Sequence, residues 1–129
     1  MNAELEKLVV IAKDSNMFPE VLKSLYAMFK DNEDFNTELR KGLSENPNCP
    51  TDVLEKLIKD NCDEVRINVA KHKKANDKML SVCTKDENRL VRLAAVNNHN
   101  ASEDILIVLM KDEDPEIVSQ ARSNLKQRL

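Results

Sequence analysis

The chain is short of turn-forming and large aromatic residues, with one Gly, four Pro, three Phe, one Tyr and no Trp in 129 residues. So little glycine argues against nucleotide-binding loops, which need it where the backbone approaches phosphate. Few glycines and prolines also leave little room for hairpins. Leu, Val, Ile, Ala and Met supply the apolar residues, and 33% of the chain is charged. This composition is typical of helices that each bury one stripe, and it predicts an all-α fold.

Long apolar runs are missing as well. No stretch approaches the roughly 20 apolar residues that span a bilayer. The apolar residues 8–12 are too few for a signal peptide. The three cysteines have neither zinc-site nor CxxC spacing, which favours free thiols in a reducing compartment. We therefore expect a cytoplasmic protein that neither crosses a membrane nor carries a cofactor.

The charge is unevenly distributed along the chain. The formal net charge is −3, yet the segment from Arg66 to Arg92 carries eight basic and three acidic residues. An acidic chain is a poor general binder of nucleic acid, but a local basic face can still contact phosphate.

One pattern recurs every 26 residues and organises the chain. Residues 59–70 read KDNCDEVRINVA, residues 85–96 KDENRLVRLAAV and residues 111–122 KDEDPEIVSQAR. A fixed period of this length indicates stacked helical repeats. Apolar positions keep the same register: Val53, Met79 and Ile105; Leu54, Leu80 and Leu106; Leu57, Cys83 and Leu109; Val65, Val91 and Ile117; Val69, Ala95 and Ala121.

Each repeat is predicted to be a short helix, an acidic turn and a second helix. The short helices start near residues 52, 76 and 102, with Thr51, Asn76 and Ser102 as predicted N-caps, and Asn88 and Asp114 cap second helices. Before residue 46 the spacing is irregular, with helices expected at 3–13, 19–30 and 37–45. The predicted buried stripe of the helix at 19–30 consists of Val21, Leu22, Leu25, Met28 and Phe29.

The prediction is therefore one domain over residues 1–129. It has an irregular N-terminal unit (1–45) and regular repeats (46–129), which amount to about four short helix pairs plus a leading helix. Because no pair can bury its stripe alone, the pairs are expected to stack into a right-handed α-solenoid.

The units resemble two related families, leucine-rich repeat variants and HEAT-like repeats. The NPN loop at residues 46–48, an LxxL-like helix, an acidic turn and a VR-led second helix carry the resemblance. It implies a ladder between neighbouring units, made by a turn Asp and an Arg six residues later: Asp34 with Arg40, Asp60 with Arg66, and Asp86 with Arg92. The last unit departs from this pattern, because Val118 stands six residues after Asp112.

The arginine column, Arg40, Arg66 and Arg92, has two interpretations. Its regular spacing suits the phosphates of a nucleic acid or an acidic peptide. Alternatively, each guanidinium forks onto the turn aspartate and nearby carbonyls. The constant Asp–Arg offset favours the structural role.

Two loops at equivalent repeat positions form a second candidate site. His72, Lys73 and Lys74 should lie beside Asn98 and His99 on one edge, where repeat proteins usually carry function. The alternative is a solvated edge on which Asn side chains cap helix ends. His72 and His99 alone do not complete a zinc site, so no metal is predicted.

Cys62 takes the slot of Asn88 and Asp114 at a helix N-terminus, a position that lowers a thiol pKa. It is a candidate reactive thiol, or simply a weak cap helped by Asp63. Cys83 and Cys49 fall at core and small-residue positions.

Catalytic groupings are not apparent in the sequence, so we expect no enzyme and no catalytic residues. The leading hypothesis is a protein-binding module that uses the groove of the second helices and the loop edge. The alternative is nucleic-acid binding through the basic segment between Arg66 and Arg92. A minor alternative is repair activity like that of HEAT-like DNA glycosylases; that resemblance implies aromatic residues at the base site, whereas this chain has only Tyr26 and no Trp.

Overall fold

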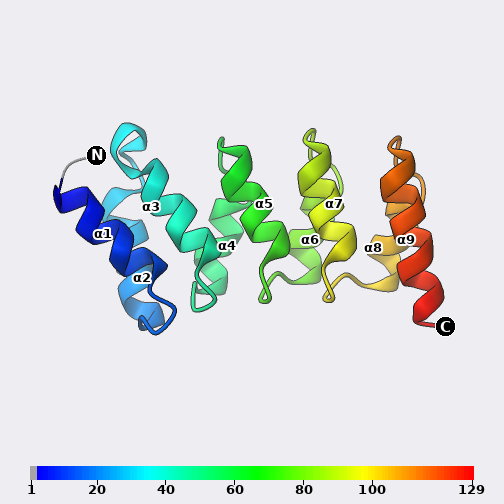
Figure 1. The fold of residues 1–129 in the computed structure, drawn as a ribbon, viewed down its shortest axis with the longest axis horizontal. Coiled ribbons are helices and arrows are strands. Elements are labelled where there is room, and N and C mark those ends of the chain that lie inside the picture. The colour runs from blue at the N-terminus through cyan, green and yellow to red at the C-terminus, as the bar shows by residue number, and fades with distance from the viewer. Residues whose placement is uncertain (1–2) are drawn as a thin grey trace. The chain divides into compact units, whose positions relative to one another are not determined.

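The computed structural model describes the backbone of residues 3–129 and the side chains of residues 3–32 and 37–129. Within this part the chain forms nine α-helices and no strand (Figure 1), which confirms the all-α class. The helices are α1 (Ala3–Lys13), α2 (Pro19–Phe29), α3 (Glu33–Glu45), α4 (Thr51–Leu57), α5 (Asp63–Lys71), α6 (Asp77–Cys83), α7 (Arg89–Asn97), α8 (Glu103–Leu109) and α9 (Pro115–Gln127). Each of these helices is too short or too polar to cross a lipid bilayer.

The helix ends follow the predicted capping residues with one exception. Side-chain oxygens of Asn76, Asn88, Ser102 and Asp114 each accept a hydrogen bond from a first-turn backbone N–H, as predicted. The predicted cap at Thr51 is wrong. Thr51 is already helical, and Pro50 precedes it with extended backbone angles and no side-chain oxygen to offer.

The chain divides into two compact units, Met1–Val69 (unit 1) and Ala70–Leu129 (unit 2). Unit 2 contains α6 to α9, and the boundary falls within α5. It therefore lies inside the segment 46–129 that the sequence predicts to be regular. Each unit has its own buried apolar residues.

In unit 1, α3 packs against α1, α2 and α4. The single glycine of the chain, Gly42, lies on α3 beside Ala12 of α1. A Cβ atom at this position would be 3.1 Å from the Cβ of Ala12. The missing side chain therefore allows the close approach of the two helices.

The stripe predicted for α2 is only partly buried. Leu22 and Leu25 are buried, as predicted. Val21 and Met28, in contrast, are 37% and 70% exposed, so their assignment to the core is wrong. Helix α2 packs mainly against α1 and α3, and its contact with α4 includes an exposed ion pair between Lys23 and Asp52. Two neighbours cover the narrow side that contains Leu22 and Leu25 and leave the adjacent apolar side in solvent.

In unit 2 the helices form two pairs. Helix α6 contacts α7 and α8, and α9 contacts α7 and α8 (Figure 1). Like helices of successive repeats are thus neighbours. The predicted apolar columns are buried here: Met79 and Ile105, Leu80 and Leu106, Cys83 and Leu109, Val91 and Ile117, Ala95 and Ala121. The 26-residue period therefore corresponds to one helix pair, and the predicted core of this unit is confirmed.

Candidate functional site

All three arginines of the column are buried: Arg40 is 7%, Arg66 9% and Arg92 7% exposed. Charged side chains are almost never buried unless they are paired. The groups that they pair with therefore show whether these arginines stabilise the fold or are available to bind a ligand.

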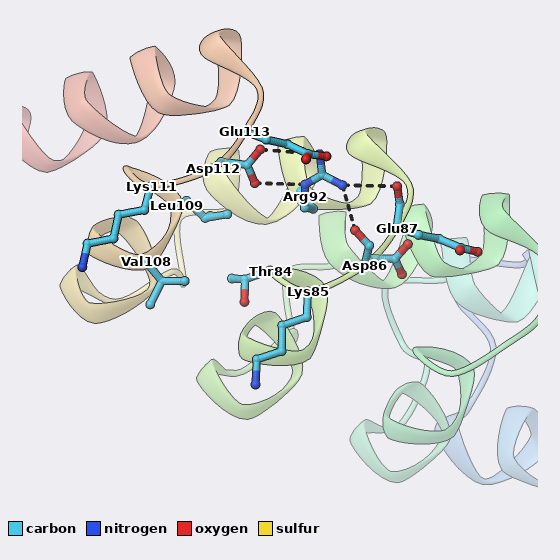
Figure 2. A pocket seen from close by; sticks show the side chains of 10 residues that line it. All are labelled: Thr84, Lys85, Asp86, Glu87, Arg92, Val108, Leu109, Lys111, Asp112 and Glu113. Carbon is cyan, nitrogen blue, oxygen red and sulfur yellow. Dashed lines mark hydrogen bonds and ion pairs between the residues drawn. The ribbon is translucent and has the colours of Figure 1, made fainter.

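In unit 2, Arg92 joins two turns of the chain (Figure 2). Its Nε lies 2.9 Å from Oδ2 of Asp112, in the turn after α8. Its Nη1 donates to the main-chain oxygens of Asp86 and Glu87, at 2.8 and 3.2 Å, in the turn after α6. The guanidinium is thus occupied by protein groups on both sides.

In unit 1, Arg40 makes the carboxylate contact of this arrangement and Arg66 makes the carbonyl contact. Nε of Arg40 is 2.6 Å from Oδ2 of Asp60, and both side chains are 8% exposed. Arg66 donates to the main-chain oxygen of Asp60 at 2.8 Å and forms an ion pair with Asp63. The structural interpretation of the column is therefore the one that these contacts support.

The ladder nevertheless uses a different carboxylate from the one predicted. Arg92 binds the carboxylate of Asp112, twenty residues later, and takes only the main-chain oxygen of Asp86. The Asp86 Oδ1 accepts the backbone N–H of Asn88 at 2.9 Å, as in an Asx-turn. Asp112 makes the same turn contact with its Oδ1, which accepts the backbone N–H of Asp114 at 2.9 Å, while its Oδ2 binds Arg92. Asp34, the predicted partner of Arg40, lies outside the residues whose side chains are described.

A cleft of about 600 Å³ opens beside Arg92 in unit 2. The turns after α6 and α8 line it. In Figure 2 Arg92 and the carboxylates of Asp86, Glu87, Asp112 and Glu113 occupy one side. The side chains of Lys85 and Lys111 extend away from these carboxylates on the other side. The cleft therefore has an acidic rim and a basic rim.

The basic rim continues onto exposed apolar residues. Val108 lines the cleft and is 53% exposed, and Val82, its equivalent on α6, is 43% exposed. Lys85 and Lys111 are also exposed, and among the described residues their ammonium groups form no hydrogen bond or ion pair. We call Val82, Lys85, Val108 and Lys111 the Val–Lys face. Sequence reasoning missed it, although its signal, V-x-x-K repeated after 26 residues, is present.

The two predicted edge loops lie side by side, as their equivalent positions indicate. The amide nitrogen of Asn98 donates to the main-chain oxygens of Ala70 and His72, at 2.8 and 3.1 Å. Its Oδ1 accepts the backbone N–H of Asn100 at 2.8 Å. Asn98 thus satisfies carbonyls at the end of the preceding second helix, the capping role that was the alternative to ligand binding.

The same role recurs at intervals of 26 residues. Asn46 donates to Ala12 and Asp14 carbonyls at 2.7 and 2.8 Å, and Asn124 donates to the Val96 carbonyl at 2.8 Å. His72 stands in this column between Asn46 and Asn98. Its Nδ1 accepts the backbone N–H of Lys74 at 3.0 Å, and the residue is 5% exposed.

Lys73 and His99 are exposed on the same edge, whereas Lys74 is half-buried. Of the predicted edge patch, then, mainly Lys73 and His99 remain accessible to a partner.

The three cysteines are free thiols with different surroundings. Cys62 is partly exposed and immediately precedes α5, whereas Cys49 and Cys83 are buried. Burial, aided by the negative charge of Asp86, raises the pKa of Cys83 to about 12. A thiol reacts as the thiolate, so this shift protects Cys83.

We expect alkylation by iodoacetamide at pH 8 to modify Cys62 first and Cys83 last. With a pKa of about 12, only on the order of one Cys83 thiol in ten thousand is ionised at that pH. Peptide mapping over time measures the three rates, and a free cysteine peptide is the reference. Equal rates for Cys62 and Cys83 would contradict the burial. If Cys62 reacts no faster than the free cysteine peptide, the prediction that its position before α5 makes it a reactive thiol is wrong.

Among the described residues no three His, Cys, Asp or Glu side chains come together in a way that could hold a metal ion. Comparisons with protein-family models, curated proteins and solved structures return no match to this chain. The likeness to leucine-rich repeat variants and HEAT-like repeats therefore stays an expectation from the sequence.

Proposed function

We propose that the chain is a non-catalytic, protein-binding module built as a right-handed α-solenoid of 26-residue helix pairs. The contacts of α6 with α8 and of α7 with α9 support the stacking of such pairs within unit 2. Its three free cysteines support a reducing compartment such as the cytoplasm.

The Val–Lys face is the observation that carries the proposal. Three of the four large apolar side chains exposed in helices α6 to α9 lie on α6 and α8: Val82, Ile107 and Val108. Of these, Val82 and Val108 take equivalent positions on two helices in contact, and exposed apolar residues that gather on one surface mark interaction sites. They support a binding surface on the first helices of the pairs, rather than in the predicted groove of the second helices.

Nucleic-acid binding through the segment between Arg66 and Arg92 receives less support. Its two defining arginines are buried and bind protein carboxylates and carbonyls. Phosphate contacts need accessible cations. The segment keeps its exposed lysines, such as Lys71 and Lys78, for such a role, while its exposed Arg89 pairs with Asp114.

Replacing Val108 with glutamate is expected to abolish partner binding and to leave the fold intact, because the side chain is 53% exposed. The measurement is quantitative affinity capture from nuclease-treated lysate on immobilised wild type and Val108→Glu. A partner bound through this face should be depleted at least about tenfold by the variant, as for a residue at the centre of an interface.

Ser123→Glu, at an exposed position of α9, adds the same charge elsewhere and is the matched control. It should capture the partner like wild type, and the circular dichroism of all three proteins should agree. Two results would count against a protein-binding function of this face. One is that Val108→Glu captures the partner as well as wild type does, and the other is that nuclease treatment abolishes the capture.

A further inference from the structure

The Val–Lys face presents the same pair of side chains twice. Val82 precedes Lys85 by three residues at the end of α6, and Val108 precedes Lys111 in the same way at the end of α8. Helices α6 and α8 are in contact, and the axes of packed helices lie about 8–10 Å apart. A ligand that crosses both helices therefore meets a valine and a lysine at intervals of about that length.

One backbone conformation has a matching repeat. A polyproline II segment has three residues per turn and rises about 3.1 Å per residue, so that every third side chain returns to the same edge after about 9.3 Å. A β-strand returns to the same edge after about 6.6 Å, and an α-helix after about 5.4 Å. Of these three, the polyproline II repeat fits the helix spacing.

The charges around the Val–Lys face indicate which side chains a bound polyproline II segment would carry. The ammonium groups of Lys85 and Lys111 have no partner among the described residues, so they can receive anions. The carboxylates of Glu87 and Glu113 on the opposite rim repel anions (Figure 2). An acidic ligand is thus held on the lysine edge, and the exposed valines beside it favour apolar side chains over a bare phosphate backbone.

We propose that the Val–Lys face binds a protein segment in polyproline II conformation with an acidic residue at every third position, each followed by an apolar residue. This inference rests on the proposed protein-binding function and names the class of partner. The acidic residues pair with Lys85 and Lys111, and the apolar residues pack on Val82 and Val108.

The test is fluorescence anisotropy of the full chain with labelled peptides. The main probe, the Glu probe, has four Glu-Val-Pro triplets. The Lys probe has Lys in place of each Glu, and the shuffled probe has the same residues in another order. A fourth probe has Ser added to each triplet, which changes the repeat from three residues to four. We expect the first probe to bind at least about tenfold more tightly than each of the others, with an affinity that falls as salt rises.

Variants with substitutions at exposed positions test whether the peptide binds at the Val–Lys face. Lys85→Glu/Lys111→Glu should lose the Glu probe and gain the Lys probe, and Val108→Glu should weaken the Glu probe. Lys126→Glu, at an exposed position on α9, is the control that should bind like wild type. Thermal unfolding should be unchanged in every variant.

Three results would overturn the inference. They are no binding of the Glu probe at about 1 mM, equal binding of the shuffled probe, or binding of a single-stranded oligonucleotide that needs the lysines but not Val108. If a captured partner still depends on Val108 in any of these cases, the proposed function stands and only the assigned partner class is wrong.

Discussion

Arg92→Ala is expected to lower the free energy of unfolding by about 3–5 kcal/mol, the cost of removing one partner of a buried ion pair. Arg92 is 7% exposed, and the side chain of Asp112 is 6% exposed. The truncation leaves the Asp112 carboxylate buried without its counter-ion. It also leaves two turn carbonyls, those of Asp86 and Glu87, without their donor. Urea unfolding followed by circular dichroism measures the change.

Two comparisons isolate the buried charge. Adding Asp112→Asn to Arg92→Ala neutralises the orphaned carboxylate, so the double variant should be more stable than Arg92→Ala alone. Arg89→Ala removes an arginine whose side chain is 44% exposed and which pairs with Asp114, so its effect should be much smaller. If Arg92→Ala is no more destabilising than Arg89→Ala, the arginine is not a strut, and the ligand-binding interpretation of the column regains support.

Asn98→Ala is expected to cost about 2–3 kcal/mol, because it deprives two partly buried carbonyls and one exposed N–H of a partner at once. The side chain donates to the carbonyls of Ala70 and His72 and accepts from the N–H of Asn100. Together these hydrogen bonds hold the loop after α7 against the end of α5. Equilibrium unfolding measures the cost, and hydrogen exchange at Asn100 reports the local opening.

The aspartate variant separates hydrogen-bond donation from shape. Asn98→Asp keeps the acceptor for Asn100 but replaces the amide donors with a negative charge facing two carbonyls, so it should be at least as unstable as Asn98→Ala. Asn97→Ala, at the exposed neighbouring position, should be nearly neutral. A stable Asn98→Asp variant would contradict the capping role and return Asn98 to the candidates for ligand binding.

Much of the local structure was predictable because it depends on neighbours in sequence. The 26-residue register placed Leu80 and Leu106 in equivalent core positions, and both are buried. Short polar residues before apolar runs identified the caps at Asn76 and Ser102, since a cap contacts backbone only three residues away. Where this local rule was applied to Thr51 it failed, because Pro50 already provides an extended residue before the helix.

The functional surface depended more on tertiary contacts. Periodicity placed Met28 on the same side of α2 as Leu25, yet it cannot tell how wide a stripe the neighbouring helices cover, and Met28 is exposed. Equally, Val82 and Val108 read as ordinary apolar helix residues. Only the packing of α6 and α8 leaves them beside two lysines that pair with no side chain in the described part of the chain.

By itself, then, the sequence determined most of the helices and, in unit 2, their pairing and their buried columns, because amphipathic period and capping act within one repeat. The tertiary structure decided which aspartate each arginine binds, and which apolar and charged side chains stay in solvent. Arg92 reaches the carboxylate of Asp112 because stacking brings the turn after α8 within 2.9 Å of its Nε, while its Nη1 meets the main-chain oxygen of Asp86.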